Sequence, residues 1–190
     1  MILKLKKLNS VISTNNEAIK LIKKKNSKPT ILIAKIQRKG RGTMGKKWVS
    51  KKGNIFATIF FELNYNKIKF QEFSLLNPVI IKNILTKYSK YKINIRWPND
   101  LMIKNQKICG ILQETIEFRD VNYLIIGIGI NTLIAPKNKK FTSISLQKCS
   151  NSIIENDQIL KDIKKSYEKI ISDITKYSGV DLKKKLQKIK

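Results

Sequence analysis

The chain has 190 residues, which is enough for one domain with a sizeable hydrophobic core. It carries 40 lysine and arginine residues against 13 aspartate and glutamate residues, a formal net charge of +27. A charge of this size favours binding to nucleic acid or to an anionic surface as one interpretation. Only four of the basic residues are arginines, however, and lysines occur in nearly every segment. The charge therefore does not by itself indicate a dedicated binding patch, and a nucleic-acid-binding domain stays an alternative.

The residues that are missing also restrict the chemistry. The chain has no histidine and two cysteines, Cys109 and Cys149, which lie far apart. This composition excludes CxxC zinc sites and the Ser-His and Cys-His pairs of nucleophilic catalysis. The longest apolar stretch, residues 124–135, is too short to span a bilayer, and lysines interrupt the first thirteen residues, where a signal peptide would need an apolar core. We therefore expect a soluble, cytoplasmic protein with no membrane partner.

In chain order, the first predicted element is a helix. Thr14, with Glu17 three residues later, has the pattern of a capping box, and apolar residues follow at helical spacing. Short runs rich in β-branched residues predict buried strands over residues 30–36 and 54–63. Apolar residues at helical spacing then predict a second helix over residues 70–88.

The second half of the chain predicts mainly strands. Residues 93–97 alternate as a strand should, residues 100–104 and 107–118 predict a hairpin, and residues 121–131 predict a further strand. A lysine-rich helical tail covers about residues 150–190.

The chain shows no internal repeat and no long linker, so we expect a single domain over residues 1–190. The tail should begin near Ile153 and break at Gly179. Strands interleaved with helices predict an α+β fold, a mixed β-sheet with helices packed on one face.

A glycine-rich loop, GRGTMGKKW at residues 40–48, follows the first predicted strand. Its three glycines allow backbone N–H groups to approach an anion closely, and its basic residues add positive charge. The spacing is not that of a Walker A loop, and a strand follows where a dinucleotide-binding turn would open a helix. From the residues alone, a phosphate-binding loop and a basic surface turn are both open.

The stretch RWPND places Asn99 and Asp100 at a junction between predicted strands. Lys107 lies across the predicted hairpin from them. An amide, a carboxylate and an ammonium group that face one pocket suit a metal-bound phosphate and a carboxylic acid substrate. A turn or capping role for Asp100 is the alternative.

Two further stretches concentrate polar residues or glycines. Ser13, Thr14 and Asn15 offer three short polar side chains, which serve either a helix cap alone or a ligand as well. In GIGIN, residues 127–131, the glycines either relieve crowding or allow a group to approach the backbone, and Asn131 either caps a turn or binds a ligand.

Taken in order, these motifs resemble the signature of the catalytic domain of biotin protein ligases. The motifs are STN (13–15), QRKGRGTMGKKW (37–48), RWPNDL (96–101), KICGILQE (107–114) and GIGIN (127–131). Each motif alone is weak, but five in the same order at matching intervals are specific.

The resemblance implies the biotin/lipoate protein ligase fold and an enzyme that uses ATP and Mg²⁺. Such an enzyme activates biotin to biotinyl-5′-AMP and then transfers biotin to one lysine of the biotin carboxyl carrier protein of acetyl-CoA carboxylase. A homodimer is familiar in this family, but the residues do not establish one. A lipoate- or octanoate-protein ligase shares the general architecture and is an alternative function.

The resemblance also implies roles for individual residues. Those expected to bind biotin are Ser13, Thr14, Asn15, Gln37, Arg41, Gly42, Thr43, Lys107 and Gly110. Those expected to bind the nucleotide are Lys46, Trp48, Asn99 and Asn131. Lys107, Arg41 and Asp100 would carry catalysis. Magnesium would be held mainly by the ATP phosphates, near Asn99 and Asp100.

Two departures from the family pattern lead to further expectations. The family loop usually has an arginine where this chain has Thr43, so we expect the adenylate to be retained less well unless Lys46 or Lys47 compensates. The chain begins almost at STN and ends soon after the lysine-rich tail, so we expect neither an N-terminal DNA-binding domain nor an SH3-like C-terminal domain. Carrier domains are commonly acidic, so the positive charge would attract one.

Overall fold

The computed structural model describes residues 2–25, 28–64, 67–137 and 142–176 of the chain. The strands are β1 Lys4–Val11, β2 Thr30–Gln37, β3 Ile55–Glu62, β4 Asn94–Arg96, β5 Asp100–Ile103, β6 Gln106–Phe118 and β7 Val121–Ile130. The α-helices are α1 Thr14–Lys23, α2 Phe70–Thr86 and α3 Asn156–Lys176. Two short 3-10 helices, η1 Thr43–Gly45 and η2 Gln147–Cys149, lie in connecting segments.

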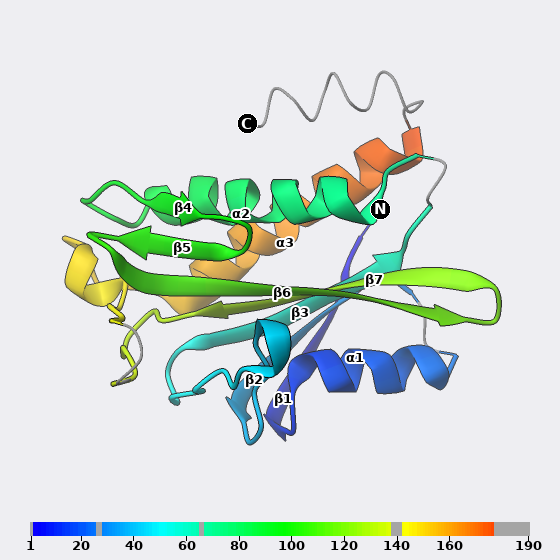
Figure 1. The fold of residues 1–190 in the computed structure, drawn as a ribbon, viewed down its shortest axis with the longest axis horizontal. Coiled ribbons are helices and arrows are strands. Elements are labelled where there is room, and N and C mark those ends of the chain that lie inside the picture. The colour runs from blue at the N-terminus through cyan, green and yellow to red at the C-terminus, as the bar shows by residue number, and fades with distance from the viewer. Residues whose placement is uncertain (1, 26–27, 65–66, 138–141, 177–190) are drawn as a thin grey trace.

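The seven strands form one sheet in the order β1-β2-β3-β7-β6-β5-β4. β1 runs parallel to β2, and the other neighbouring pairs are antiparallel. The α+β fold with a mixed sheet that the sequence predicts is therefore confirmed (Figure 1). β6 and β7 lie side by side near the middle of the sheet. Their glycines, Gly110, Gly127 and Gly129, line the candidate site described below.

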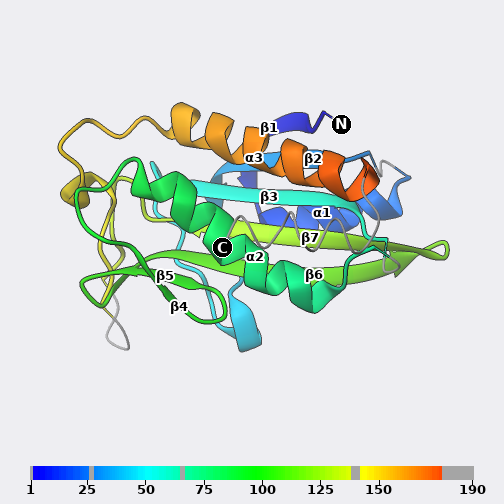
Figure 2. The same cartoon turned by 90° about the horizontal axis from the view of Figure 1, so that it is seen from above.

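The helices cover both faces of the sheet, which corrects the expectation of helices on one face. α2 and α3 lie over one face, and α1 lies under the other (Figures 1 and 2). The reason lies in the central strands, since β3 is buried from Ile55 to Phe61 without alternation. A strand that is apolar on both sides requires cover on both sides. Ile22 of α1 packs with Phe60 and Ile125 to supply the second cover.

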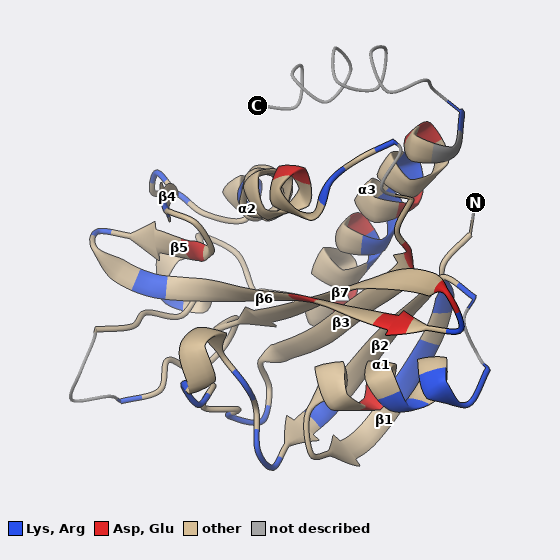
Figure 3. Ribbon diagram, turned by 45° about the vertical axis from the view of Figure 1, so that its right-hand side comes forward, with Lys and Arg blue, Asp and Glu red and all other residues tan. Residues whose placement is uncertain are grey.

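β1 is a strand that the sequence pattern did not predict. Its lysines leave it mostly exposed, and it lies at the edge of the sheet, paired to β2. Lysines on an edge strand are a common protection against pairing with another chain. Basic residues are in fact spread over helices, strands and loops throughout the described chain (Figure 3).

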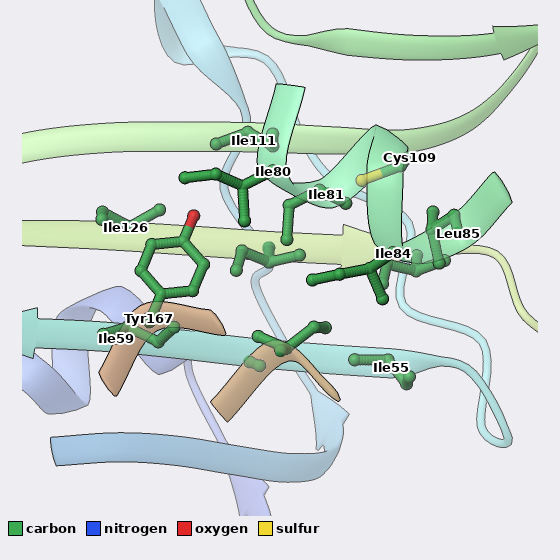
Figure 4. Packing of buried hydrophobic residues seen from close by; sticks show 14 of the residues in the cluster. Ile55, Ile59, Ile80, Ile81, Ile84, Leu85, Cys109, Ile111, Ile126 and Tyr167 are labelled. Atoms are coloured by element: carbon green, nitrogen blue, oxygen red, sulfur yellow. The ribbon is translucent and has the colours of Figure 1, made fainter. Parts of the chain in front are cut away.

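The main core lies between the sheet and the pair of helices α2 and α3. Tyr167 of α3 is fully buried and lies near Ile59 and Ile126 of the sheet, while Ile80 and Ile81 of α2 approach from the other helix (Figure 4). Most of this core is isoleucine and leucine, which pack densely without polar atoms. It fixes the sheet on which the candidate site is built.

The last described helix, α3, begins at Asn156, three residues after the expected start of the helical tail. The break expected at Gly179 lies outside the described residues. In the part of the chain that the structure describes, no helix combines the length and the apolar character needed to cross a membrane.

Candidate active site

A pocket lies where α1 begins and where the loop between β2 and β3 approaches β6 and β7. Its lining residues come from these four parts of the chain, from β2 and β3 and from the turn before β5. They are Ser13, Thr14, Asn15, Gln37, Arg41, Gly42, Thr43, Trp48, Ala57, Asn99, Lys107, Gly110, Ile111, Leu112, Gly127, Ile128 and Gly129. The space inside it is about 40 Å³. Arg41 and Trp48 of the loop are among the side chains that line it.

The start of α1 supplies a polar wall. Thr14 donates from both its backbone N–H and its hydroxyl to Oε1 of Gln37, at 2.8 and 3.0 Å. The Gln37 amide nitrogen in turn donates to Ser50 Oγ at 3.1 Å. The predicted capping box is wrong, since Ser13 is the N-cap residue and Glu17 N–H donates to its carbonyl oxygen. The Thr14 hydroxyl is bonded to Gln37 of β2 instead of capping α1.

Trp48 covers the sheet at the centre of the pocket. A Cβ at Gly129 would lie 2.5 Å from the Trp48 ring, and one at Gly110 would lie 2.7 Å from it. Only glycine therefore allows the indole to lie against these strands. The indole Nε1 is buried with no hydrogen-bond partner among the described residues. A buried donor without a partner is costly, and this one lies against β7 at Gly129.

Lys107 and Asp100 form the charged side of the pocket. The Lys107 ammonium lies 2.6 Å from one Asp100 carboxylate oxygen, and Arg96 donates to the other at 2.7 Å. Lys107 Nζ also lies 5.3 Å from the centre of the Trp48 ring, within the range of a cation–π contact. The side chains of Lys107 and Asp100 are largely buried, so the ammonium is held in place rather than free in solvent.

Arg41 is fixed from the opposite side. Its two terminal nitrogens donate to the two carboxylate oxygens of Glu114 at 2.9 and 2.6 Å, a bidentate pair. Glu114 also accepts a hydrogen bond of 2.7 Å from the Asn15 amide. Two cations, Arg41 and Lys107, thus line one small pocket, an arrangement suited to a carboxylate and a phosphate.

The loop between β2 and β3 folds back on itself like a small hairpin. Gly42 N–H donates to the Lys46 carbonyl at 2.7 Å, and Trp48 N–H donates to the Gly40 carbonyl at 2.9 Å. Met44 sits at the tip with a φ of 53° and a side chain that is 91% exposed. These bonds turn Trp48 toward the sheet and leave the tip in solvent.

The structure brings most of the predicted site residues together. The biotin-binding set lines the pocket, as do Trp48 and Asn99. Lys46 does not, because its side chain is exposed on the outer side of the loop. Asp100 reaches the pocket through Lys107. Asn131 is buried at the end of β7, where its amide nitrogen donates to the Lys107 carbonyl at 3.2 Å.

Several residues of the site were not assigned a role from the sequence. They are Glu114, Thr58, Arg96, Gly127 and Gly129. The two glycines did carry a signal, because glycine inside a strand indicates close approach of another group. Glu114 is the last residue of the KICGILQE motif, but neither it nor Thr58 was given a partner, since the fold alone brings their partners near.

Among the described residues, the site contains no nucleophile paired with a histidine. Burial raises the pKa of the Cys109 thiol well above its usual range, which keeps it protonated at neutral pH. The hydroxyls of Ser13 and Thr43 line the pocket, but the chain has no histidine to activate them. The arrangement can therefore position two substrates that react with each other, without a covalent enzyme intermediate.

A magnesium ion is not accommodated by protein side chains alone. Among the described residues, no group of three or more Asp, Glu, His and Cys residues could hold a metal. Both oxygens of Asp100 already face cations, Arg96 and Lys107. The residues fit an ion whose other ligands are phosphate oxygens of a bound nucleotide.

Comparison with known proteins identifies the family of the chain. Residues 8–131 match the model of the Biotin/lipoate A/B protein ligase family. The chain is 36% identical over 101 residues to the bifunctional ligase/repressor BirA of Escherichia coli (strain K12), which covers 52% of this chain and 32% of that protein. It is 30% identical over 127 residues to the biotin–[acetyl-CoA-carboxylase] ligase of Paracoccus denitrificans, covering 65% of this chain and 52% of that protein.

The fold of the chain is also similar to that of a solved structure. The biotin protein ligase from Aquifex aeolicus in complex with biotin and ATP superposes with a TM-score of 0.74 at 27% identity, covering 96% of this chain and 76% of that one. The chain spans about a third to a half of the length of the two curated relatives above.

Proposed function

Because the chain belongs to the biotin/lipoate A/B protein ligase family, we propose that it is an ATP-dependent biotin protein ligase. In this proposal it converts biotin and ATP to biotinyl-5′-AMP and diphosphate. It then transfers biotin to one lysine of the biotin carboxyl carrier protein of acetyl-CoA carboxylase. The Aquifex relative binds both proposed small substrates, and the Paracoccus relative carries the proposed acceptor in its name.

The observation that carries the proposal is one pocket that joins a neutral polar wall to a cationic side. Thr14 and Gln37 offer donors and acceptors that fit the ureido group of biotin, which has two N–H groups and a carbonyl oxygen. The dithiolane ring of lipoate has no such groups, so this wall favours biotin. Lys107 on the other side fits the carboxylate of biotin and the phosphate that reacts with it.

In the first step, an oxygen of the biotin carboxylate forms a bond to the α-phosphorus of ATP, and the bond from that phosphorus to the diphosphate oxygen breaks. Negative charge gathers on the oxygens around the α-phosphorus as this happens. Lys107 and Arg41 are the cations that would stabilise it, because they are held in place before the reaction. Magnesium, bound by the phosphates near Asn99 and Asp100, would neutralise the leaving diphosphate.

In the second step, the unprotonated amine of the acceptor lysine forms a bond to the biotinyl carbonyl carbon, and the bond from that carbon to the AMP oxygen breaks. The nitrogen then loses a proton to the surrounding water. Both oxygens of Asp100 face cations, so we assign it the task of holding Lys107 and orienting the incoming amine. Trp48 and Asn131 would contact the nucleotide, each offering a buried polar atom that is without a partner in the described residues. An ATP-dependent reaction on a carrier domain is consistent with a cytoplasmic location.

The test is a carrier-modification assay. The protein is incubated with ATP, Mg²⁺, a biotin carrier domain and either biotin or lipoate, and the carrier is then weighed by mass spectrometry. We expect a mass increase of one biotinyl group with biotin and none with lipoate. Lys107→Gln should reduce the rate by at least about 100-fold through loss of the cation at the phosphate.

Lys148→Gln, which removes the same charge from an exposed lysine, is the matched control and should keep the wild-type rate. A carrier that gains lipoate in place of biotin would assign the chain to the lipoate branch. A carrier that gains neither would refute the ligase proposal.

A further inference from the structure

Glu114 of β6 is hydrogen-bonded to two polar side chains, those of Asn15 and Arg41. A third, Thr58, is hydrogen-bonded to Asn15. Thr58 of β3 donates to the Asn15 amide oxygen at 2.6 Å, and the Asn15 amide nitrogen donates to Glu114 at 2.7 Å. Arg41 of the loop donates to Glu114 with both terminal nitrogens. Gly127 of β7 leaves room for this chain of bonds, because a Cβ there would collide with the Asn15 amide oxygen.

The chain of bonds is anchored in the core at one end and reaches the pocket at the other. Thr58 and Asn15 are 0% and 2% exposed, whereas the Arg41 side chain is 37% exposed. Each terminal nitrogen of Arg41 uses one of its two N–H donors on Glu114, and Nε is buried without a partner among the described residues. An Nε–H donor in a residue that lines the pocket is available to an acceptor on a ligand.

We propose that Glu114 is a positioning residue for biotin, acting through Arg41 and Asn15 without contacting biotin itself. This inference rests on the proposed function and adds a residue to it. Glu114 fixes the Arg41 guanidinium by a bidentate pair and aligns the Asn15 amide, both of which line the pocket. It also ties the glycine-rich loop to β6, since Arg41 belongs to that loop.

The ion pair between Arg41 and Glu114 should affect the affinity for biotin more than the rate of the reaction. A guanidinium held by two parallel bonds has already lost its rotamer freedom, so a ligand does not have to order it. Without Glu114, the ligand would order both Arg41 and the loop, and biotin affinity would fall. The reacting phosphate would lie at Lys107, which Asp100 holds independently of Glu114. Arg41 keeps its charge when Glu114 is replaced, so the rate at saturating biotin should fall by a smaller factor than the affinity.

The test compares Glu114→Gln with Glu117→Gln, an exposed glutamate on the same strand that provides the same change of charge. By calorimetry, Glu114→Gln should weaken biotin binding on the order of tenfold, the size expected for a lost bidentate charge pair. Glu117→Gln should bind as the wild type does. In steady-state assays, KM for biotin should rise by a larger factor than kcat falls.

A double-mutant cycle separates positioning from general damage. In an Arg41→Gln background, adding Glu114→Gln should cost less than about threefold further affinity, because Glu114 acts mainly through Arg41. A full tenfold loss in that background, or no loss in the wild-type background, would overturn the proposal. Glu114→Asp, which keeps the charge but shortens the reach, should recover part of the affinity.

Hydrogen exchange of the ligand-free protein tests the same pairing without biotin. Amides of residues 40–48 should exchange faster in Glu114→Gln, while those of β3 and β7 should be unchanged. Unchanged exchange in the loop, or faster exchange across the whole sheet, would overturn the positioning role. If the wild type binds no biotin, the proposed function fails, and the exchange result still decides whether Glu114 holds the loop.

Discussion

At the residue scale, Thr43 is the position at which this loop departs from the related family. It lines the pocket in the turn η1, beside the exposed tip residue Met44. A threonine supplies one hydroxyl, whereas an arginine would add a cation that forms charge-assisted bonds to the adenylate phosphate. We expect Thr43→Arg to slow the release of preformed biotinyl-5′-AMP on the order of tenfold. Release is measured by chasing labelled adenylate from the isolated complex.

The control for this variant is Met44→Arg, which adds the same charge to the neighbouring side chain in solvent. It should release the adenylate at the wild-type rate. Equal rates for the wild type and Thr43→Arg would show that residue 43 does not retain the intermediate. A similar slowing in both variants would assign the effect to loop charge in general.

Site residues could be predicted from the sequence where a motif reflects a local requirement, such as close approach of another group to the backbone. The glycines of GIGIN marked a surface that another group approaches, and the structure places Trp48 there. The pairing of Arg41 with Glu114 could not be predicted, since 73 residues separate them. Lys46 was expected at the nucleotide, but the turn at Met44 leaves it on the outer side of the loop.

At the scale of elements, a buried polar chain joins α3 to α2 and the sheet. The Tyr167 hydroxyl donates to Asn77 Oδ1 at 2.8 Å, and the Asn77 amide donates to Gln113 of β6 at 2.5 Å. Tyr167→Phe would leave the buried Asn77 oxygen without its partner. We expect this change to lower the free energy of unfolding by about 1–3 kcal/mol, as measured by denaturant titration.

Tyr88→Phe is the matched control, because it removes the same hydroxyl from a half-buried tyrosine. Asp162, which accepts from Tyr88 at 3.0 Å, keeps its contacts with Lys87 and Gln158. Loss of the Tyr88 hydroxyl should lower the free energy of unfolding by less than about 1 kcal/mol. An equal loss in both variants would contradict a special role for the buried chain.

The elements themselves were predictable wherever periodicity was strong, as for β2, β3 and α2. β1 was not, because Lys6 and Lys7 break the polar–apolar alternation of an edge strand that is held mainly by its pairing with β2. The side of the sheet on which α1 lies was not predictable either. Which face a helix covers depends on the order of the strands, and the order β1-β2-β3-β7 joins segments that are distant in the sequence.

At the scale of the whole molecule, the chain has a net charge of +27, and its basic residues lie on helices, strands and loops throughout the described part (Figure 3). Such a field attracts any acidic protein at a distance and does not select one orientation. Orientation would then come from the pocket and its rim. The homodimer familiar in the family stays a prediction, since the exposed edge strand β1 does not establish it.

The distributed charge leads to a prediction about the two steps of the reaction. Added salt screens the attraction between protein surfaces, since the Debye length falls from about 10 Å at 0.1 M to about 3 Å at 1 M. Adenylate formation occurs in a buried pocket at saturating ATP, where screening is weaker. We therefore expect KM for an acidic carrier domain to rise on the order of tenfold between about 0.05 and 0.3 M salt, with little change in the rate of diphosphate release.

Transfer of biotin to hydroxylamine, a small uncharged acceptor, is the control and should show no such dependence on salt. Equal salt dependence for the carrier and for hydroxylamine would mean that the surface charge does not recruit the acceptor.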